Sequence, residues 1–427
     1  MIRSSKHPIK FANYQKRIDY LSFLKEYRRI AQIYLDYLWD FVYVWEGKDS
    51  SIFILDVKND CLDVPKYFNG DKRLNLQTPL SARAVDFCVV QVLGCLKAAT
   101  DKRRKQLFVY NNLKAENQDT SKLEKKFSKP LTKPRITNIN PEMSSKCCDY
   151  KETKGFFDGF IQLKSIGKVF EKIKIPIKYN APANKWRLKG KVKTSFLFSN
   201  KTITIRWEIE EPKKKEEGLT LGADQGKIDV LVLSNDVRTK QVDNHGHSLS
   251  SIIDKLARKK KGSKAFRKAQ SHRQNFINHS INQLNLTNVK LIKLEKIVNI
   301  NFKKRVSRKM KHWCNPLIRD KLIKVCEETG VQIIQQSSTY RSQRCSSCGL
   351  VRKANRKGKV YNCSGCGMVC DADLNAAKNH EQELPNVPTN LRKLRRNLGK
   401  GFLWKPTGFF EITGEVLRVP SSNKQKD

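Results

Sequence analysis

The sequence predicts a multidomain α/β protein, and three patterns along the chain lead to this prediction. Apolar residues recur at helical spacing in the N-terminal part, short alternating segments follow, and strands then alternate with helices toward the C-terminus. With 427 residues the chain can form two to four domains, each with its own hydrophobic core.

The N-terminal half is predicted to combine helices with a small β-structure. Apolar residues repeat every three or four positions over 14–45, and a second helical stretch covers 81–112. Residues 117–140 are polar and rich in lysine and proline, which is typical of an exposed linker. Alternation over 156–209 predicts the strands of a small sheet or barrel, and the charged stretch 210–218 marks the main domain boundary.

The C-terminal half is predicted to be a mixed α/β domain with a metal-binding module inserted before its last element. The tail after His380 shows no clear periodicity, although residues 391–396 form a basic cluster. The expected elements are a strand pair over 219–233, a basic helix over 252–284, a strand over 289–295, a helix over 315–329 and a strand over 331–335.

The charge of the chain predicts a polyanionic partner. Lysine and arginine number 85 against 41 acidic residues, which gives a formal net charge of +44. The sequence contains no run of 18 apolar residues and no amphipathic basic anchor, so membrane binding is a poor explanation of this charge. The first residues contain no apolar segment of a secretory signal, and we expect a cytoplasmic protein that binds nucleic acid.

Four cysteines predict one structural zinc site. They form two C-x-x-C pairs, and a glycine follows each pair and allows a tight turn. Four thiolate ligands leave no open position on the metal, so we expect a structural Zn²⁺ and no catalytic one. Cys370 fits the spacing less well, and we interpret the other cysteines as small buried hydrophobic residues or incidental thiols. The predicted ligands are Cys345, Cys348, Cys363 and Cys366.

Three acidic residues are candidate ligands of a second kind of metal. Asp224 and Glu295 each end an apolar strand, and Asp373 lies near the start of a predicted helix. A single carboxylate is usually a solvated surface charge. Together, however, these three could hold two Mg²⁺ ions roughly 4 Å apart, the arrangement that hydrolyses phosphodiesters. They therefore predict nuclease chemistry, provided that the fold brings them together.

Basic clusters near these acids are candidate contacts to nucleic acid. A basic run is more often a solvated face, but the excess positive charge favours binding to phosphates here. Arg344 precedes the first cysteine pair and is a candidate for transition-state stabilisation or nucleic-acid contact. The other candidate residues are Arg258, Arg267, Arg273, Lys303, Lys304 and Arg305.

The order of these motifs resembles that of the TnpB (OrfB-type) transposon-encoded nucleases, and compact type V CRISPR effectors share the pattern. The resemblance covers about residues 217–380. It rests on Gly222-Ala-Asp-Gln-Gly226, Ile292-Lys-Leu-Glu295, Tyr340-Arg-Ser-Gln-Arg-Cys-Ser-Ser-Cys-Gly349, Cys363-Ser-Gly-Cys-Gly367 and Asp371-Ala-Asp-Leu-Asn-Ala-Ala-Lys-Asn379. The spacing of the last motif aligns Asp373, and not Asp371, with the family's final acid.

The resemblance implies an RNA-guided DNA endonuclease that cuts double-stranded target DNA beside a short recognition motif. It implies an RNase H-like RuvC domain with Asp224, Glu295 and Asp373 as ligands of two Mg²⁺ ions, and a zinc ribbon with one Zn²⁺. The implied domains are a wedge β-barrel (1–14 and 130–216), a helical recognition lobe (15–129), the RuvC-like domain (217–337 and 371–381), the zinc ribbon (338–370) and a basic C-terminal tail (382–427).

Two positions depart from the family pattern, and neither is a ligand. Ala223 replaces a common aliphatic residue, and Lys296 follows the second acid where the family often has aspartate. Three alternatives stay open: a miniature type V CRISPR effector, a catalytically impaired RNA-guided DNA-binding repressor, and a zinc-ribbon protein that binds RNA without guidance. The protein is expected to be a monomer or a homodimer.

Overall fold

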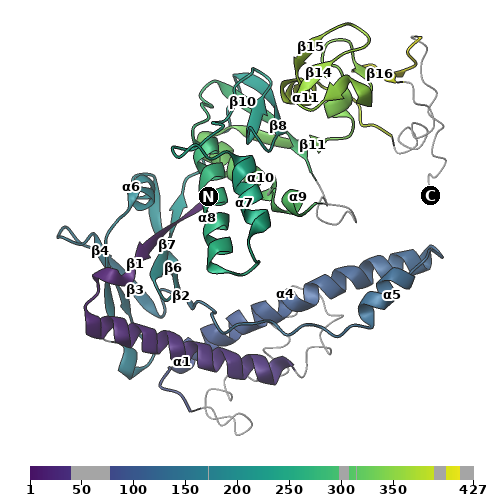
Figure 1. The fold of residues 1–427 in the computed structure, drawn as a ribbon. Helices are drawn as coiled ribbons and strands as arrows, with labels where there is room; N and C mark the ends of the chain where they lie inside the picture. The colour runs from purple at the N-terminus through teal and green to yellow at the C-terminus, as the bar shows by residue number, and fades with distance from the viewer. Residues whose placement is uncertain (40–76, 172, 298–306, 314, 389–400, 414–427) are drawn as a thin grey trace. The chain divides into compact units, whose positions relative to one another are not determined.

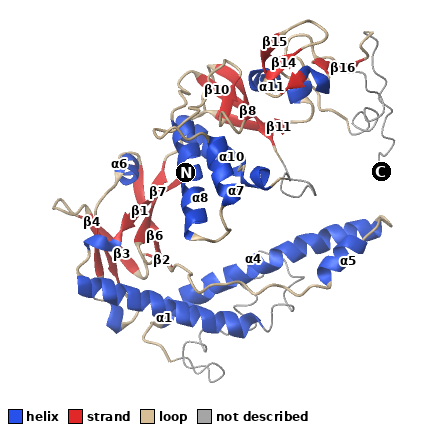
Figure 2. Cartoon of the chain, viewed as in Figure 1, coloured by secondary structure: helices blue, strands red, loops and turns tan. Residues whose placement is uncertain are grey.

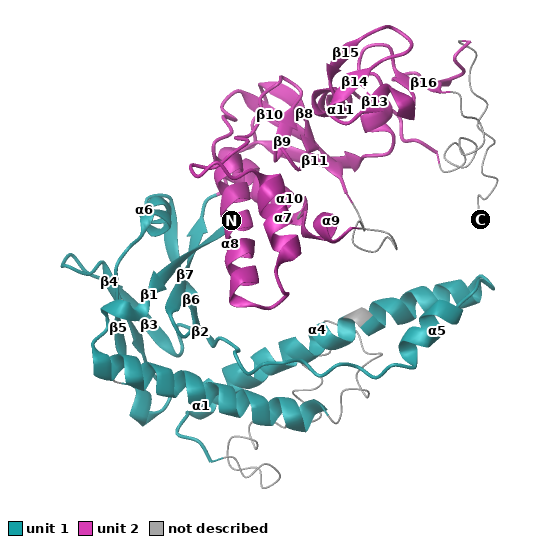
Figure 3. Cartoon of the chain, in the orientation of Figure 1, with its two compact units in different colours: residues 1–210 teal, residues 211–427 magenta. Residues whose placement is uncertain are grey.

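The computed structural model describes residues 1–39, 77–171, 173–297, 307–313, 315–388 and 401–413. The chain divides into two compact units, Met1–Glu210 and Glu211–Asp427 (Figure 3). This division falls at the start of the charged stretch 210–218.

The first unit combines two long helices with short strands (Figures 1 and 2). One short helix, α5, lies inside the stretch that the sequence suggested to be a linker. The helices are α1 (Tyr14–Trp39), α4 (Ala82–Ala115), α5 (Ser121–Phe127) and α6 (Ala181–Arg187), with 3-10 turns η1 (Ile9–Phe11) and η4 (Lys168–Phe170). The strands are β1 (Ile2–Pro8), β2 (Glu142–Ser144), β3 (Cys148–Glu152), β4 (Gly159–Leu163), β5 (Lys174–Ile177), β6 (Gly190–Phe198) and β7 (Thr202–Ile209).

The strands of the first unit form two open sheets, so the predicted β-barrel is wrong for the described residues. One antiparallel sheet has the order β1-β7-β6-β2, and the other has the order β3-β4-β5. Closure would require the edge strands β1 and β2 to pair, but each of them pairs with one inner strand alone.

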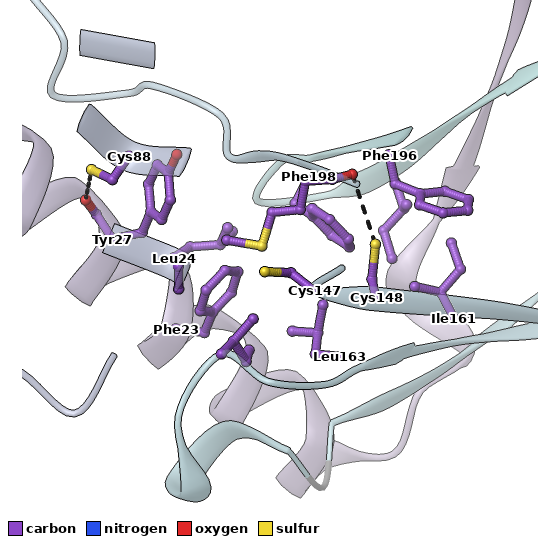
Figure 4. Packing of buried hydrophobic residues seen from close by; sticks show 14 of the residues in the cluster. Phe23, Leu24, Tyr27, Cys88, Cys147, Cys148, Ile161, Leu163, Phe196 and Phe198 are labelled. Carbon is purple, nitrogen blue, oxygen red and sulfur yellow. Dashed lines mark hydrogen bonds between the residues drawn. The ribbon is translucent and has the colours of Figure 1, made fainter. Parts of the chain in front are cut away.

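The helices and sheets of this unit share one hydrophobic core. Helix α1 turns Tyr20, Phe23, Leu24 and Tyr27 toward it, each fully buried. Figure 4 shows Phe23, Leu24 and Tyr27 beside Cys88 of α4 and buried residues of the strands. The Cys88 thiol donates to the Tyr27 carbonyl oxygen at 3.6 Å. The predicted helical lobe and β-region are therefore packed as one body here.

The second unit is built on a mixed sheet of order β11-β10-β8-β9. Strand β10 is parallel to β8 and β11, whereas β9 is antiparallel to β8. The predicted basic helix is two helices, α7 and α8. The elements are β8 (Leu219–Gln225), β9 (Leu231–Leu233), β10 (Val289–Lys296), β11 (Gln332–Ser337), α7 (Leu249–Arg258), α8 (Lys264–Asn282), α9 (Arg308–His312), α10 (Asn315–Thr329) and α11 (Ala372–Glu381).

The cysteine module lies between β11 and α11 and contains two small sheets. Strands β16 and β17 come from the predicted tail, after α11. Strand β16 pairs with β12 and β17 pairs with β16, so this part of the tail completes a sheet of the module. The basic cluster 391–396 lies outside the described residues. The elements are η6 (Arg341–Gln343), β12 (Leu350–Val351), η7 (Lys353–Asn355), β13 (Arg356–Lys357), β14 (Val360–Asn362), β15 (Val369–Asp371), β16 (Phe402–Lys405) and β17 (Gly408–Phe410). Within the described chain, no helix has the length and apolarity to cross a membrane.

Candidate functional site

Two parallel strands place Asp224 and Glu295 at the same edge of the central sheet. Strand β8 is in register with β10 through the pair Ala223 and Leu294, so the following residues of both strands emerge side by side. The backbone N–H of Gln225 donates to Glu295 Oε1 at 2.9 Å and fixes this carboxylate. Both acids are buried, with 7% of Asp224 and 9% of Glu295 exposed.

Helix α11 places Asp373 beside this edge. Asp371 caps the helix, because its Oδ1 accepts hydrogen bonds from the backbone N–H groups of Asp373 (2.9 Å) and Leu374 (3.0 Å). The helix packs directly on β8, since a Cβ added at Gly222 would lie 1.9 Å from the Ala377 carbonyl oxygen. The Asp373 carboxylate lies near the end of β8, where a Cβ on Gly226 would be 3.5 Å from its Oδ2.

Gly222 provides a test of this packing. We expect Gly222→Ala to push α11 away from β8, to lower stability by roughly 1–3 kcal/mol, and to displace Asp373. Binding of divalent cations at the acidic site, measured by calorimetric titration, should therefore weaken more than the change in melting temperature alone would explain. Gly94→Ala is the control, because a Cβ there meets nothing within 4 Å and its helix should tolerate alanine. Unchanged binding of divalent cations by Gly222→Ala would contradict the positioning role.

Burial and mutual repulsion act on the acidic pair. Burial, with the charges of Glu295 and Asp373, raises the pKa of Asp224 well above its usual range. Burial, together with the charge of Asp373, raises the pKa of Glu295 to about 7, against the hydrogen bond from Gln225 and the charge of Arg356. Crowded, buried carboxylate oxygens are the hard donors that Mg²⁺ prefers, so the donor set fits divalent cations. A bound cation would favour the ionised form of each acid.

Two cations from the cysteine module contact Asp373. Arg356 donates to its Oδ1 at 2.7 Å, and Lys359 donates to its Oδ2 at 2.5 Å. Lys359 also lies 3.1 Å from Oδ2 of Asp229. Burial lowers the pKa of Lys359, but these two hydrogen bonds outweigh it and raise the pKa overall. The sequence alone did not indicate that Arg356, Lys359 and Asp229 belong to the site. The basic run 352–359 between the cysteine pairs was the signal that could have indicated the two cations.

Asp229 lies in the turn after β8, and 1% of it is exposed. Its Oδ1 accepts a hydrogen bond from Gln241 at 2.9 Å, and Arg238 lies 3.7 Å from its Oδ2. The same guanidinium lies 3.4 Å from Asp371. Asp229 therefore contacts both Lys359 and Arg238, and so holds these two cations beside the predicted acids.

His380 is a further neighbour of the acidic pair. A ring nitrogen of His380 and one oxygen each of Asp224 and Glu295 lie within 4.8 Å of one another, a group that does not include Asp373 among the described residues. Burial lowers the pKa of His380 to about 3, with a smaller contribution from Arg341, so the ring is neutral at physiological pH. His380 lies two helical turns after Asp373, a spacing that could have indicated a shared face.

The four predicted cysteines converge, and their geometry fits zinc. The Sγ atoms of Cys345 and Cys366 are 3.7 Å apart, and those of Cys348 and Cys363 are 3.6 Å apart. A tetrahedron with Zn–S bonds of about 2.3 Å has edges of about 3.8 Å, which agrees with these separations. Cys370 is outside the cluster, as its spacing suggested.

Side-chain amides of α11 tie this cysteine module to the acidic site. Asn375 accepts a hydrogen bond from Ser346 N (2.9 Å) and donates to the Arg344 carbonyl oxygen (2.7 Å). Asn379 donates to the same carbonyl oxygen at 2.7 Å. The knuckle that holds Cys345 is therefore fixed to the helix that carries Asp373.

The structure corrects the expectation for Arg344. This side chain is 3% exposed, and its guanidinium donates to the backbone oxygens of Trp404 (2.7 Å) and Cys345 (3.2 Å) and to Asn379 Oδ1 (2.5 Å). These bonds connect β16, the first knuckle and α11. Arg344 stabilises the module, and its buried position does not suit contact with nucleic acid.

The other predicted basic contacts divide into three groups. Arg258 and Arg267 are exposed on α7 and α8 and stay candidates. Arg273 is 8% exposed and donates to the His312 carbonyl oxygen, so it holds α8 to α9 and does not present its charge to a ligand. Lys303, Lys304 and Arg305 lie outside the described residues.

Comparisons with known proteins agree with this arrangement. The profile of the Cas12f1-like TNB domain matches residues 317–380, which span α10, β11, the cysteine module and α11. The CRISPR-associated endodeoxyribonuclease Cas12f1 of Sulfoacidibacillus thermotolerans is 36% identical over 97 residues, 22% of this chain and 22% of that protein. A TnpB-like protein of Acanthamoeba polyphaga mimivirus is 36% identical over 50 residues, 12% of this chain and 9% of that protein.

Over these segments the chain is similar to TnpB-like proteins and to compact type V effectors. The matched segments span about a fifth or less of the length of these curated relatives. A solved Cas12f1–sgRNA–target DNA complex is similar over 86% of this chain and 82% of that chain, with a TM-score of 0.50 and 15% sequence identity. At that identity the similarity shows the fold alone, which is that of a compact Cas12 protein.

Proposed function

We propose that this protein is an RNA-guided, Mg²⁺-dependent DNA endonuclease that cuts target DNA beside a short recognition motif. The observation that carries the proposal is that three acids far apart in the sequence gather at one sheet edge. All three are buried, and the pKa values of Asp224 and Glu295 are raised. The net charge of +44 supports RNA and DNA as partners. In this proposal 217–337 and 371–381 form the RuvC-like domain, and 338–370 form the zinc ribbon.

Each residue has a defined part in the proposed reaction. Asp224, Glu295 and Asp373 would hold two Mg²⁺ ions, which supply an activated water and stabilise the leaving oxygen. Gln225 fixes the Glu295 carboxylate through its backbone N–H. Arg356 lies at Asp373 Oδ1 with 29% of its side chain exposed, so its guanidinium can also reach a phosphate of the strand to be cut.

Lys359 is expected to limit how tightly the acids bind divalent cations. Its ammonium occupies one oxygen of Asp373, so it competes electrostatically with any cation at that oxygen. We expect Lys359→Met to tighten Mg²⁺ or Mn²⁺ binding about 3- to 30-fold. Calorimetric titration with each metal measures this directly. Lys357→Met, an exposed lysine of the same hairpin, controls for the loss of one charge. Equal or weaker binding by Lys359→Met would contradict the competition.

The proposed function is tested by expressing the gene with its native flanking DNA and sequencing the RNA that copurifies at high salt. A single species with a constant structured part and a segment that matches flanking DNA is expected. That RNA should then direct Mg²⁺-dependent cleavage of a matching plasmid. A heterogeneous RNA population with no guided cleavage would instead favour a zinc-ribbon protein that binds RNA without guidance.

The similarity to Cas12f1 proteins supports a miniature type V effector as the second candidate. The two candidates share the reaction and differ in the source of the guide. The position of the gene beside a repeat array or beside a transposon end distinguishes them. A guided DNA-binding repressor would bind the same target without cutting it, and the plasmid assay separates that possibility.

A further inference from the structure

Helix α1 carries a second apolar stripe that the core of its unit does not use. The core face consists of fully buried residues such as Tyr20 and Phe23. Tyr14, Ile18 and Leu21 follow one another at helical spacing on another face, with 72%, 39% and 43% of each residue exposed. Single exposed apolar residues need no explanation, but three on one helix face together mark a binding surface.

This stripe borders a groove of about 530 Å³ at the start of the helix. Pro8 and Ile9, at the end of β1 and the start of η1, form another part of its wall. The turn between β6 and β7 forms the remaining wall. A hydrogen bond holds this turn in place, since the Ile9 backbone N–H donates to the Lys201 carbonyl oxygen at 3.1 Å. The groove is thus built entirely from elements of the first unit.

The charged residues that line this groove are all cationic. Lys10, Arg17 and Lys201 lie in its wall, and no carboxylate belongs to the described lining. The Nε of Arg17 is buried without a hydrogen-bond partner among the described residues, so one donor at this wall is unused. A ligand that fits must therefore combine a flat apolar part with negative charge.

We propose that this groove, defined by Lys10, Tyr14, Arg17 and Lys201, binds an unpaired nucleotide of a nucleic-acid strand. The base stacks on the exposed Tyr14 ring over the apolar floor, and the three cations neutralise the adjoining phosphates. The proposal rests on the proposed function for the identity of its partner. It adds a site built from residues of the first unit alone, whereas the acidic residues belong to the second. RNA and single-stranded DNA share this chemistry, and the experiment separates them.

The test is photo-crosslinking of the full-length protein to iodouracil-substituted oligouridylate RNA and oligothymidylate DNA. Trypsin cleaves after Lys10 and Lys16, so the expected product is an oligonucleotide adduct on peptide 11–16, which contains Tyr14. In fluorescence anisotropy, Tyr14→Ala should weaken binding of the preferred strand about 5- to 150-fold, as expected for loss of one stacked base. The salt dependence of binding should stay unchanged in this variant.

A second variant separates stacking from charge. Lys201→Gln should weaken binding and reduce the slope of log affinity against log salt by about 0.7, because one phosphate contact is lost. Phe156→Ala is the matched control, since this aromatic residue is 76% exposed in the same unit and lies outside the groove. It should bind like the unchanged protein.

The outcomes distinguish the inference from the proposed function. If the unchanged protein cleaves guided targets while Tyr14→Ala binds normally and peptide 11–16 carries no adduct, the groove inference alone is wrong. If the unchanged protein binds neither strand and cleaves nothing, the proposed function fails with it. Melting curves of the variants exclude misfolding, because the substituted side chains are largely exposed.

Discussion

Asp224→Asn is expected to abolish guided DNA cleavage, by about 10³-fold or more, while it stabilises the protein in the absence of divalent metal. The loss of cleavage follows from removal of a charged oxygen ligand of the proposed metal site. The gain in stability follows from burial, because the ionised Asp224 carboxylate lies beside Glu295 in a site from which water is largely excluded. An uncharged amide of the same shape avoids this repulsion.

The gain in stability should depend on pH with a defined sign. Folding raises the pKa of Asp224, so its penalty is absent at pH values below the unfolded pKa near 4 and grows as the pH rises toward the folded pKa. In buffer that contains neither Mg²⁺ nor a chelator, so that zinc is retained, the variant should therefore melt a few degrees above the unchanged protein at pH 8, by a smaller margin at pH 5, and at nearly the same temperature below pH 4. Asp320→Asn is the control, because Asp320 on α10 is exposed to solvent. This variant should keep its cleavage activity and should not gain stability as the pH rises.

A lower melting temperature of Asp224→Asn at pH 8 would mean that this carboxylate stabilises the fold, against the argument from burial. Mg²⁺ should reverse the ranking, because it stabilises the protein that can bind it by mass action. The same titration should leave the melting temperature of the variant nearly unchanged. The two measurements together separate a ligand of the metal from an acid that is merely buried.

Removal of zinc is expected to abolish cleavage even when Mg²⁺ is abundant. Zinc binding contributes about 10–16 kcal/mol to the folding of small zinc modules, so the ribbon should unfold without it. The knuckle around Cys345 is bonded to Asn375 of α11, and the hairpin between the cysteine pairs supplies Arg356 and Lys359. Loss of the ribbon therefore frees the helix that carries Asp373.

Cys363→Ser tests this connection with a matched control. The variant should contain less than one zinc per chain by elemental analysis, lose cleavage, and keep most of its helical circular dichroism, because α1 and α4 belong to the first unit. Cys370→Ser should keep both zinc and cleavage, since this thiol lies outside the cluster. Full cleavage by zinc-free protein would show that the ribbon does not position the acidic site.

The sequence by itself determined the parts whose signals are local. Hydrophobic periodicity located α1, α4, α10 and the strands β7, β8 and β10, and the paired C-x-x-C spacing selected the four cysteines that converge. The acids at the ends of β8 and β10 could be chosen because strand ends and turn glycines are visible in sequence. The order of motifs supplied the resemblance to the TnpB-like nucleases.

The tertiary structure alone decided everything that depends on long-range contacts. Sheet closure depends on whether the edge strands β1 and β2 meet, so alternation of residues could not distinguish two open sheets from a barrel. Packing of separate elements brings four further residues to the site. They are Arg356 and Lys359, which contact Asp373, Asp229, which contacts Lys359, and His380, which lies beside Asp224 and Glu295. Arg344 and Arg273 resemble surface cations in sequence, yet the fold buries both. Arg273 donates to the His312 carbonyl oxygen. Arg344 donates to the carbonyl oxygens of Trp404 and Cys345, because a guanidinium has enough donors to join acceptors from separate elements.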